Sequence, residues 1–458
     1  MLVTDKILSK VIEVALSQGA DFADVYLEDT RKRHFSYLDG KPEKAISGHS
    51  LGAGIRLFRG TEQIYTYTND LSEEGLLRAA RQAAAALAGG GAGRATPARA
   101  IDRAGGHVTF LKTGSEKHWD SLRLMDESAR AVSGLITQVQ SDISESVKHV
   151  QIFNSEGLHR EESRAYMNTF STVYSEENGL KEYGMERKGF TGTMDDWRKV
   201  DFKEIAQNAA TQSLRILRAA WTPAGEMPVL LDNAFGGVIF HEACGHGLET
   251  TSVAKNASVF AGKLGEKIAH ESVTAIDDGT IAGANGSLEM DDEGESTKRT
   301  VLIENGILKS YIVDKMGARQ TGYAVTGSGR RQDYRFAPAS RMRNTFIAAG
   351  QSSFEDMIKD IDYGLYAKSL GGGSVQPGTG AYNFAVNEAY IVRNGRIEEQ
   401  VKGASLIGTG IETLGRIVKV GQDLRLAAGT CGSVSGHIPV TGGQPPLLVS
   451  KLTVGGKA

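Results

Sequence analysis

The stretch MPVLLDNAFGGVIFHEACGH, residues 227–246, decides how the second half of the chain folds. Met227 to Leu231 is a short apolar run of the kind that forms a buried strand. Asp232 or Asn233 then caps a helix that runs through apolar residues into His241. This order predicts a strand that leads directly into a short helix, with His241 near the end of that helix.

The two histidines of this stretch have an unusual spacing for a metal site. Zinc peptidases commonly carry His-Glu-x-x-His on a helix, where both imidazoles share one face and the glutamate is the general base. Here His241 and His246 lie five positions apart, which separates their rings by about 140° on a regular helix, against about 40° for the usual spacing. Both can bind one ion only if the helix widens or breaks between them. Gly245 and Gly247 lie where that distortion is needed, although a chance match in a core helix is the alternative.

A catalytic zinc site needs a third protein ligand, and the residues alone leave its identity open. Cys431 lies in a glycine-flanked loop, Gly429 to Ser433, that would let the backbone approach an ion, although a buried thiol fits this position as well. His437 and Glu249 are the other candidates. Cys244 is expected to be a small buried residue, because it would point away from the ion once the histidines converge.

The N-terminal half alternates helical and strand-like patterns. Helices are predicted over residues 5–18, 71–88, 115–135 and 201–220, and strands over 23–28, 34–38, 52–59, 63–68, 148–154, 164–176 and 181–193. A glycine-rich stretch from residue 89 to about 106 is expected to be flexible. The segment 221–225 contains Pro and Gly and ends the last helix. We therefore expect an N-terminal α+β domain over residues 1–222, with mixed or antiparallel strands and covering helices.

Residues 223–458 are predicted to form a β-rich domain, barrel-like or sandwich-like, that carries the short distorted helix. Many of the 56 glycines of the chain lie here, which is typical of short strands joined by tight turns. Asn305-Gly306 and Asn394-Gly395 are strong hairpin signals. The acidic run Asp291-Asp292-Glu293 lacks a regular ligand spacing and is interpreted as a solvated loop. The whole chain is thus expected to be an α+β protein.

Composition limits the classes of function. The 52 basic and 55 acidic residues give a net charge of -3, so no nucleic-acid partner is expected. The first apolar stretch is interrupted by charged residues, and no later segment approaches 18 uncharged apolar residues, so neither a signal peptide nor membrane contact is expected. A cytoplasmic location is therefore predicted. In such a compartment the two cysteines are more consistent with a ligand or buried role than with a disulfide.

Further motifs resemble those of one metallopeptidase family. The chain resembles the TldD/PmbA family, and within it the TldD-type catalytic subunit. The resemblance is highly specific in the C-terminal half and weaker in the N-terminal segment 19–25. The segments that carry it are Phe240–Glu249, Ile276–Thr280, Asp291–Gly294, Leu302–Leu308, Gly327–Arg331, Gly371–Gly373, Lys402–Gly408 and the tail from Gly443 to Gly456.

The resemblance implies a metallopeptidase in which His241, His246 and Cys431 hold Zn²⁺ and Glu242 activates the zinc-bound water. It implies that unstructured or small peptides, including modified ones, are hydrolysed inside an enclosed dimer cavity. The second subunit would be a TldE/PmbA-like homologue that lacks the motif, or a second copy of this chain. The N-terminal domain would provide dimerisation and a cavity wall. Thr250, where the family often has Gly, is a small departure that puts no ligand in doubt.

Contacts to the peptide are less constrained by the sequence. Backbone groups of the glycine-rich loops or an arginine would serve as the oxyanion donor, and glycine runs suggest a close approach of an extended peptide, although ordinary turns are the alternative. The candidate substrate-binding residues are Arg330, Arg331, Gly371, Gly372, Gly373 and Tyr382. Two other functions stay open: a non-catalytic, zinc-containing peptide-binding scaffold subunit, and a zinc hydrolase of a non-peptide amide.

Overall fold

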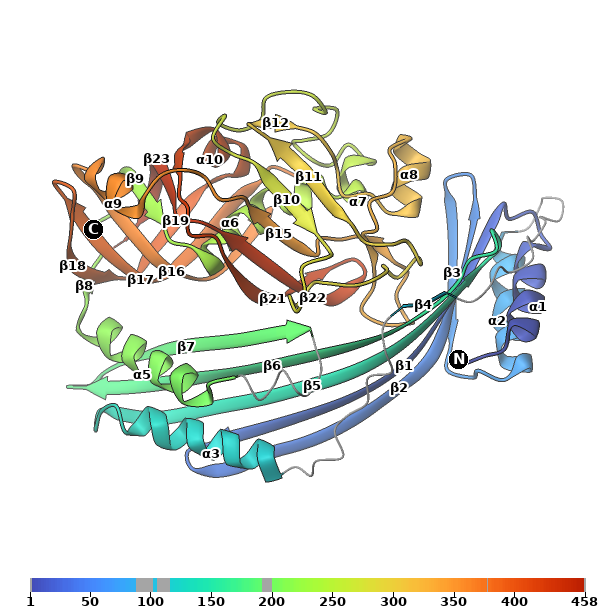
Figure 1. The fold of residues 1–458 in the computed structure, drawn as a ribbon, viewed down its shortest axis with the longest axis horizontal. Coiled ribbons are helices and arrows are strands. Elements are labelled where there is room, and N and C mark those ends of the chain that lie inside the picture. The colour runs from blue at the N-terminus through green and yellow to red at the C-terminus, as the bar shows by residue number, and fades with distance from the viewer. Residues whose placement is uncertain (1, 88–101, 105–115, 192–199, 377, 457–458) are drawn as a thin grey trace.

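The computed structural model describes residues 2–87, 102–104, 116–191, 200–376 and 378–456. A long curved sheet forms the N-terminal half, and the C-terminal half lies over the concave side of this sheet (Figure 1). The stretch 89–106, predicted to be flexible, lies outside the described residues except for 102–104, which form a strand.

The N-terminal sheet has seven strands in the order β3-β2-β1-β5-β6-β4, with β7 beside β6. Its pairs are antiparallel apart from β4, which runs parallel to β6. The strands are β1 (Phe22–Leu38), β2 (Lys41–Arg59), β3 (Glu62–Thr68), β4 (Asp102–Ala104), β5 (Ile136–Asn154), β6 (His159–Glu177) and β7 (Leu180–Thr191).

Strand β1 corrects the prediction of two separate strands over 23–28 and 34–38. The charged residues between them remain in the strand, because they pair with β2 on one side and with β5 on the other. Arg33, for example, lies 2.5 Å from Glu145 of β5. Charges within a strand therefore do not end it where the neighbouring strand supplies the opposite charge.

Within the described residues, four helices cover the N-terminal sheet at the predicted places: α1 (Asp5–Leu16), α2 (Glu73–Ala86), α3 (Glu116–Arg130) and α5 (Phe202–Arg218). The apolar stripes of α1 and α2 share one core with β1 and β2. Helices α3 and α5 share a second core on the convex face of the sheet (Figure 1). The predicted N-terminal arrangement of strands with covering helices is confirmed.

An eight-stranded sheet in the C-terminal half has the order β16-β9-β23-β19-β17-β18-β8, with β20 beside β23. Because β16 also pairs with β17, strands β16, β9, β23, β19 and β17 close a ring, and the barrel-like expectation is confirmed. The strands are β8 (Ala220–Trp221), β9 (Gly225–Leu231), β16 (Tyr363–Gln376), β17 (Ala381–Arg393), β18 (Arg396–Lys402), β19 (Ala404–Thr409), β20 (Ile417–Val420) and β23 (Leu447–Gly455). The domain boundary after residue 222 stays a prediction.

A six-stranded sheet in the order β12-β11-β10-β15-β22-β21 lies beside this ring. Both predicted hairpins are present, since Asn305 turns β11 into β12 and Asn394 turns β17 into β18, each with positive φ. The strands are β10 (Ala275–Asp278), β11 (Arg299–Glu304), β12 (Ile307–Leu308), β15 (Asn344–Ile347), β21 (Arg425–Ser433) and β22 (Gly436–Gln444). The smaller elements are β13 (Gly329–Arg330), β14 (Ala339–Ser340), α7 (Thr250–Val253), α8 (Lys315–Thr321), α9 (Phe354–Lys359) and α10 (Gly410–Arg416).

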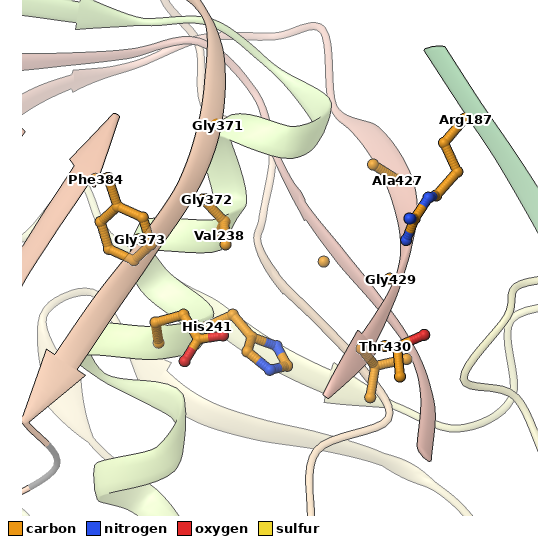
Figure 2. A pocket seen from close by; sticks show the side chains of 13 residues that line it. Arg187, Val238, His241, Gly371, Gly372, Gly373, Phe384, Ala427, Gly429 and Thr430 are labelled. Atoms are coloured by element: carbon orange, nitrogen blue, oxygen red, sulfur yellow. The ribbon is translucent and has the colours of Figure 1, made fainter. Parts of the chain in front are cut away.

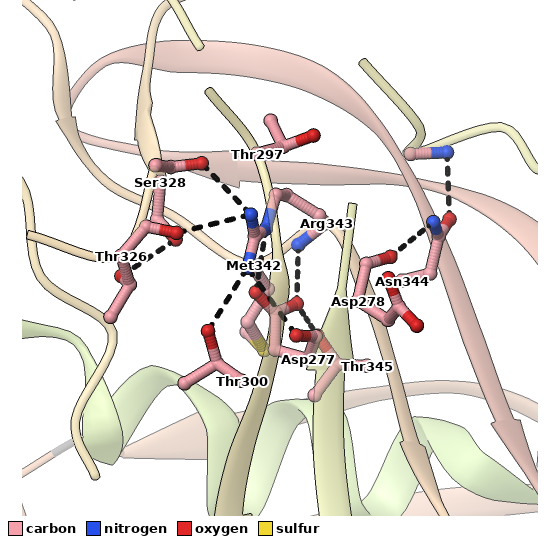
Figure 3. A network of polar contacts seen from close by, with 12 residues as sticks. Asp277, Asp278, Thr297, Thr300, Thr326, Ser328, Met342, Arg343, Asn344 and Thr345 are labelled. Carbon is pink, nitrogen blue, oxygen red and sulfur yellow. Dashed lines mark hydrogen bonds and ion pairs between the residues drawn. The ribbon is translucent and has the colours of Figure 1, made fainter. Parts of the chain in front are cut away.

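A buried ion pair fixes the segment that enters β15 (Figure 3). The fully buried Arg343 donates from Nε to Asp277 of β10 at 2.8 Å, and its guanidinium also donates to the carbonyl oxygen of Gly327 at 3.0 Å. Thr345 donates to the same carboxylate at 2.7 Å. Asp277 belongs to one of the motifs shared with the family, and its role here is to hold β10 and β15 together.

The acidic run Asp291-Asp292-Glu293 is buried, so its interpretation as a solvated loop was wrong. Arg164 of β6 donates to Asp292 at 2.5 Å, and Arg56 of β2 donates to Glu293 at 2.6 Å. Two arginines of the N-terminal sheet thus neutralise carboxylates of the C-terminal half. The sequence carries no signal of this pairing, because Arg56 and Glu293 are 237 positions apart.

Candidate metal centre

The helix that carries the two histidines is interrupted between them, as the spacing predicts. A 3-10 turn, η1 (Ala234–Gly237), leads into helix α6 (Val238–Ala243), and a second 3-10 turn, η2 (Gly245–Leu248), follows Cys244. A Cβ atom at Gly245 would lie 2.2 Å from the sulfur of Met342, and one at Gly247 would lie 2.8 Å from the ring of Phe260. The glycines therefore allow the broken turn to pack closely against its neighbours.

This break brings three donor groups together. One ring nitrogen of His241, one of His246 and the sulfur of Cys431 all lie within 4.8 Å of one another, and all three residues are buried. Cys431 Sγ lies 3.2 Å from His246 Nε2. Cys431 is part of strand β21, paired with Ile438 of β22, and not of a loop. The strand places the thiol opposite the end of the helix.

The donor set fits a zinc ion. Zinc–nitrogen bonds of about 2.0–2.1 Å and zinc–sulfur bonds of about 2.3 Å place neighbouring ligand atoms roughly 3.5 Å apart in a tetrahedral site, close to the observed Sγ–Nε2 distance of 3.2 Å. Two imidazoles and one thiolate also leave a fourth position open, as in catalytic zinc sites. The ligand roles of the three residues stay a prediction that this geometry supports.

The protein environment favours the thiolate form of Cys431. Burial raises the pKa of this thiol, but the neighbouring His241 and His246 outweigh that effect and hold the pKa at about 4. Burial lowers the pKa of His246, whereas Glu249 and Cys431 raise it well above its usual value. Zinc binds the thiolate form of cysteine and the neutral form of histidine. The lowered pKa of Cys431 therefore favours metal binding, whereas the raised pKa of His246 means that its imidazole gives up a proton when it binds a metal.

Two buried residues orient the candidate ligands. Glu249 Oε2 lies 3.0 Å from Nδ1 of His246, which leaves Nε2 to face Cys431. Arg341 donates to the carbonyl oxygen of Cys431 at 2.7 Å, and its Nε lies 3.9 Å from Glu249. Glu249, one candidate for the third ligand, thus contacts the nitrogen of His246 that points away from Cys431. The other candidate, His437, is exposed and lies outside the described donor cluster.

His241 and Glu242 open into a cavity of about 250 Å³ (Figure 2). The predicted glycines of β16, Gly371 to Gly373, form one wall, and residues of β21 form another. Glu242 Oε2 lies 3.7 Å from His246 Nε2, so this carboxylate lies beside the donor cluster and also lines the cavity. Arg187 of β7 also lines the cavity, although no local pattern in the sequence singles it out.

The other candidate substrate-binding residues lie elsewhere. Arg330 donates to the carbonyl oxygens of Met342 and Pro439, both at 2.7 Å. Arg331 donates to the carbonyl oxygen of Asp292 at 3.0 Å, and the hydroxyl of Tyr382 lies 2.7 Å from that of Thr413. All three side chains are buried and none lines this cavity. Their contact with substrate stays a prediction, while the structure gives them a packing role.

Three family models match the chain in succession. The models for domain 1, the central domain and the C-terminal domain of the PmbA/TldA metallopeptidases match residues 23–87, 110–217 and 224–456. The chain belongs to the PmbA/TldD metallopeptidase family. The resemblance read from the motifs around His241 is therefore confirmed.

Some relatives named as metalloproteases match nearly the whole chain, and another matches about half of it. A TldD metalloprotease homologue of Haemophilus influenzae is 34% identical over 98% of this chain and 96% of its own length. A metalloprotease of Methanocaldococcus jannaschii is 32% identical over 94% of this chain and 96% of its own. A relative in Saccharolobus solfataricus, 33% identical over 56% of this chain and 57% of its own, is named as a zinc metalloprotease.

Solved structures share the fold. TldE of Thermococcus kodakarensis has a TM-score of 0.76 at 20% identity and covers 98% of this chain and 99% of its own. A Thermotoga maritima protein, named as a candidate modulator of DNA gyrase, has a TM-score of 0.80 at 22% identity and covers 98% of this chain and 100% of its own. In the described part of the PmbA/TldD chain, no helix has both the length and the apolar character needed to cross a membrane.

Proposed function

We propose that this PmbA/TldD-family chain is a zinc-dependent peptidase in which His241, His246 and Cys431 hold the ion and Glu242 is the general base. One observation carries the proposal: an interrupted helix and a distant strand bring three zinc-type donor atoms within 4.8 Å of one another. Glu242 lies beside them and faces a cavity. The metalloprotease relatives support the same class of reaction.

The zinc ion and the side chains of the protein supply different parts of the proposed hydrolysis. Zinc, when bound, supplies a Lewis acid for the scissile carbonyl and lowers the pKa of a coordinated water to about 7. The Glu242 carboxylate accepts the proton of the attacking water and delivers it to the leaving amine nitrogen. Glu249 keeps Nδ1 of His246 engaged, at 3.0 Å, so that Nε2 faces the metal position.

Two strand edges at the cavity support an unstructured or small peptide as substrate. Strand β16 pairs with β9 only over residues 365–367, so the side of β16 toward the cavity at Gly371–Gly373 has no described partner strand. Strand β21 is the last strand of its sheet. An extended peptide that adds to such an edge is held by its backbone, which gives little selection among side chains.

We also propose that a homologous subunit, TldE/PmbA-like or a second copy, closes the cavity, with the curved N-terminal sheet as a wall. The TldE structure with the same fold supports this partnership. Both cysteines are free, which suits the reducing cytoplasm. Light scattering on the chain alone and after co-expression with the homologue tests the assembly. A monomer with full peptidase activity would contradict it.

The test of the proposed function compares Glu242→Gln with Cys431→Ser in the assembled complex. A general base contributes about 10²- to 10⁴-fold, so Glu242→Gln is expected to lower kcat/KM for unfolded peptides by that factor with its zinc retained. Cys431→Ser is expected to lose both activity and zinc affinity. Unchanged turnover by Glu242→Gln would favour the scaffold function, and cleavage of small amides but not peptides would favour the amide hydrolase.

A further inference from the structure

Arg187 is the residue that the N-terminal sheet contributes to the metal cavity. Among the described residues that line this cavity, it alone carries a permanent positive charge. It extends from β7 toward Ala427 and Gly429 of β21, on the side of the cavity away from His241 (Figure 2). The proposed general base, Glu242, follows His241 in the chain and lies 3.7 Å from His246.

The position of β7 fixes the direction of this side chain. A Cβ atom at Gly184 would lie 2.2 Å from the backbone of α5, whereas one at Gly189 would lie 2.8 Å from Ala428 of β21. Because side chains alternate along a strand, the even-numbered residues here face α5 and the odd-numbered residues, including Arg187, face β21. The Phe170 ring, 5.6 Å from the guanidinium carbon, supports Arg187 from the neighbouring strand.

The charge of Arg187 has no described counter-ion. Arg56 and Arg164, which also reach from this sheet to the C-terminal half, each bind a carboxylate of that half. Arg187 takes part in none of the ion pairs found among the described residues, and its side chain is exposed. A guanidinium presents a planar fork of donors that matches a carboxylate, and the cavity around it is otherwise walled largely by glycine and small side chains.

We propose that Arg187 binds a carboxylate of the peptide substrate, either its C-terminal carboxylate or an acidic side chain, while the bond to be cleaved lies at Glu242. Arg187 is then a specificity-determining residue within the peptidase function proposed above, on which this inference rests. The cavity volume of about 250 Å³ lies just below the usual ~300–1,000 Å³ of ligand pockets. A short segment of peptide therefore separates the carboxylate from the scissile bond.

The experiment uses the assembled enzyme and matched peptides: one with a free C-terminal carboxylate, the same peptide as its C-terminal amide, and amides with a single Glu or Gln at successive positions. A charge-assisted contact is expected to favour the best carboxylate-bearing peptide over its neutral match by about tenfold in kcat/KM. Because the contact forms when the peptide binds, the difference between the two peptides is expected in KM and not in kcat. Arg187→Gln should reduce the ratio to about one, and Arg187→Lys should restore part of it.

Lys188→Gln is the matched control, because it removes the same charge from the next residue, which faces α5. It is expected to keep the wild-type ratio. Preference for the free acid identifies the C-terminus as the source, and preference for the Glu-bearing amide identifies a side chain. An Arg187→Gln variant that folds normally and keeps the wild-type ratio, or a wild type without any preference, would overturn the inference.

A binding measurement separates this inference from the proposed function. In the Glu242→Gln background, calorimetry is expected to show about tenfold tighter binding of the preferred carboxylate-bearing peptide than of its neutral match. The added Arg187→Gln substitution should abolish this difference. If the wild type cleaves no peptide but the binding difference depends on Arg187, the peptidase proposal fails and the carboxylate site stands. Equal binding of the two peptides would contradict the proposed carboxylate site at Arg187.

Discussion

His246 is connected through side-chain contacts on both of its ring nitrogens. Nε2 lies 3.2 Å from Cys431, and Nδ1 lies 3.0 Å from Glu249. Arg341 then joins Glu249 to the backbone of Cys431. A carboxylate on the far nitrogen of a ligand histidine fixes the tautomer and the ring orientation, so Glu249 is expected to act on the metal through His246.

Glu249→Gln should therefore weaken zinc binding without removing a ligand. Partners of this kind typically contribute about 10- to 100-fold in metal affinity, and competition with a chelator measures that change. Glu266→Gln, which alters an exposed glutamate, is the control. Unchanged affinity in Glu249→Gln would contradict the orienting role, and loss of an oxygen from the metal shell would make Glu249 a ligand instead.

At the scale of single residues, the sequence predicted the arrangement of residues that are close together along the chain. The spacing of His241 and His246 required an interrupted helix, and the structure has one. Cys431 was ambiguous from its own residues and became a specific prediction only through the family resemblance. Arg341 and Arg187 were missed, because their contacts join segments that are distant in sequence, such as Arg341 and Cys431, 90 positions apart.

Strands β16 and β21 form facing walls of the cavity, and the glycines of β16 have unequal roles. A Cβ atom would lie 2.5 Å from Asn387 at Gly371 and 2.1 Å from Phe384 at Gly373, whereas at Gly372 it would meet nothing within 4 Å. Gly373 is thus required for packing within the ring of strands, because a Cβ atom there would also meet the backbone oxygen of Asn383 at 2.5 Å, whereas at Gly371 the end of the Asn387 side chain would have to shift. Gly372 can carry a side chain, and such a side chain would occupy space beside the cavity.

Gly372→Val is expected to fold normally and to raise KM for peptides about tenfold or more, because the new side chain obstructs an extended peptide beside β16. Thermal unfolding and steady-state kinetics check the two parts of this prediction. Gly48→Val is the matched control, since Gly48 also lies in a strand, β2, with nothing within 4 Å of its added Cβ. A wild-type KM in Gly372→Val would place the peptide elsewhere.

Helices were predicted more accurately than strands, for a physical reason. The apolar residues of α1 and α5 recur at helical spacing because one face of each packs on a sheet. Residues 41–49 of β2 are all exposed, so no alternation of apolar and polar residues marks them as strand. The prediction therefore began at residue 52, where burial begins, and missed the first half of a 19-residue strand.

Charged groups buried between the two halves form contacts that join them, and these contacts make the stability of the protein depend on pH. Asp314 caps helix α8 by accepting from the Gly317 amide at 2.9 Å. Burial and the nearby Glu293 raise the pKa of Asp314 from 3.8 to about 6. Glu293 also binds Arg56 of the N-terminal sheet. The protonation of Asp314 is thus linked to the contact between the halves.

The raised pKa has a defined effect on stability. Between pH 3.8 and about 6 the folded state binds more protons at Asp314 than the unfolded state does, so this group lowers the free energy of unfolding as pH rises through that range. Asn is also a good helix cap, so Asp314→Asn should keep the fold and remove the effect. Relative to this variant, the wild type should lose about 2 kcal/mol between pH 4 and 7.

Urea unfolding of the two proteins across this pH range measures the difference. Asp120→Asn, a change at an exposed aspartate, should show no comparable pH-dependent difference from the wild type. A constant difference between wild type and Asp314→Asn at all pH values would show that folding does not shift the pKa of Asp314, and would contradict this prediction.

In the whole molecule, the break after α6 and the strand β21 are proposed to assemble one zinc site from His241, His246 and Cys431. X-ray absorption at the zinc edge of the zinc-loaded protein tests this most directly. The structure predicts two nitrogen ligands at about 2.0–2.1 Å and one sulfur ligand at about 2.3 Å, with the sulfur lost in Cys431→Ser. A zinc shell without sulfur in the wild type would contradict the account.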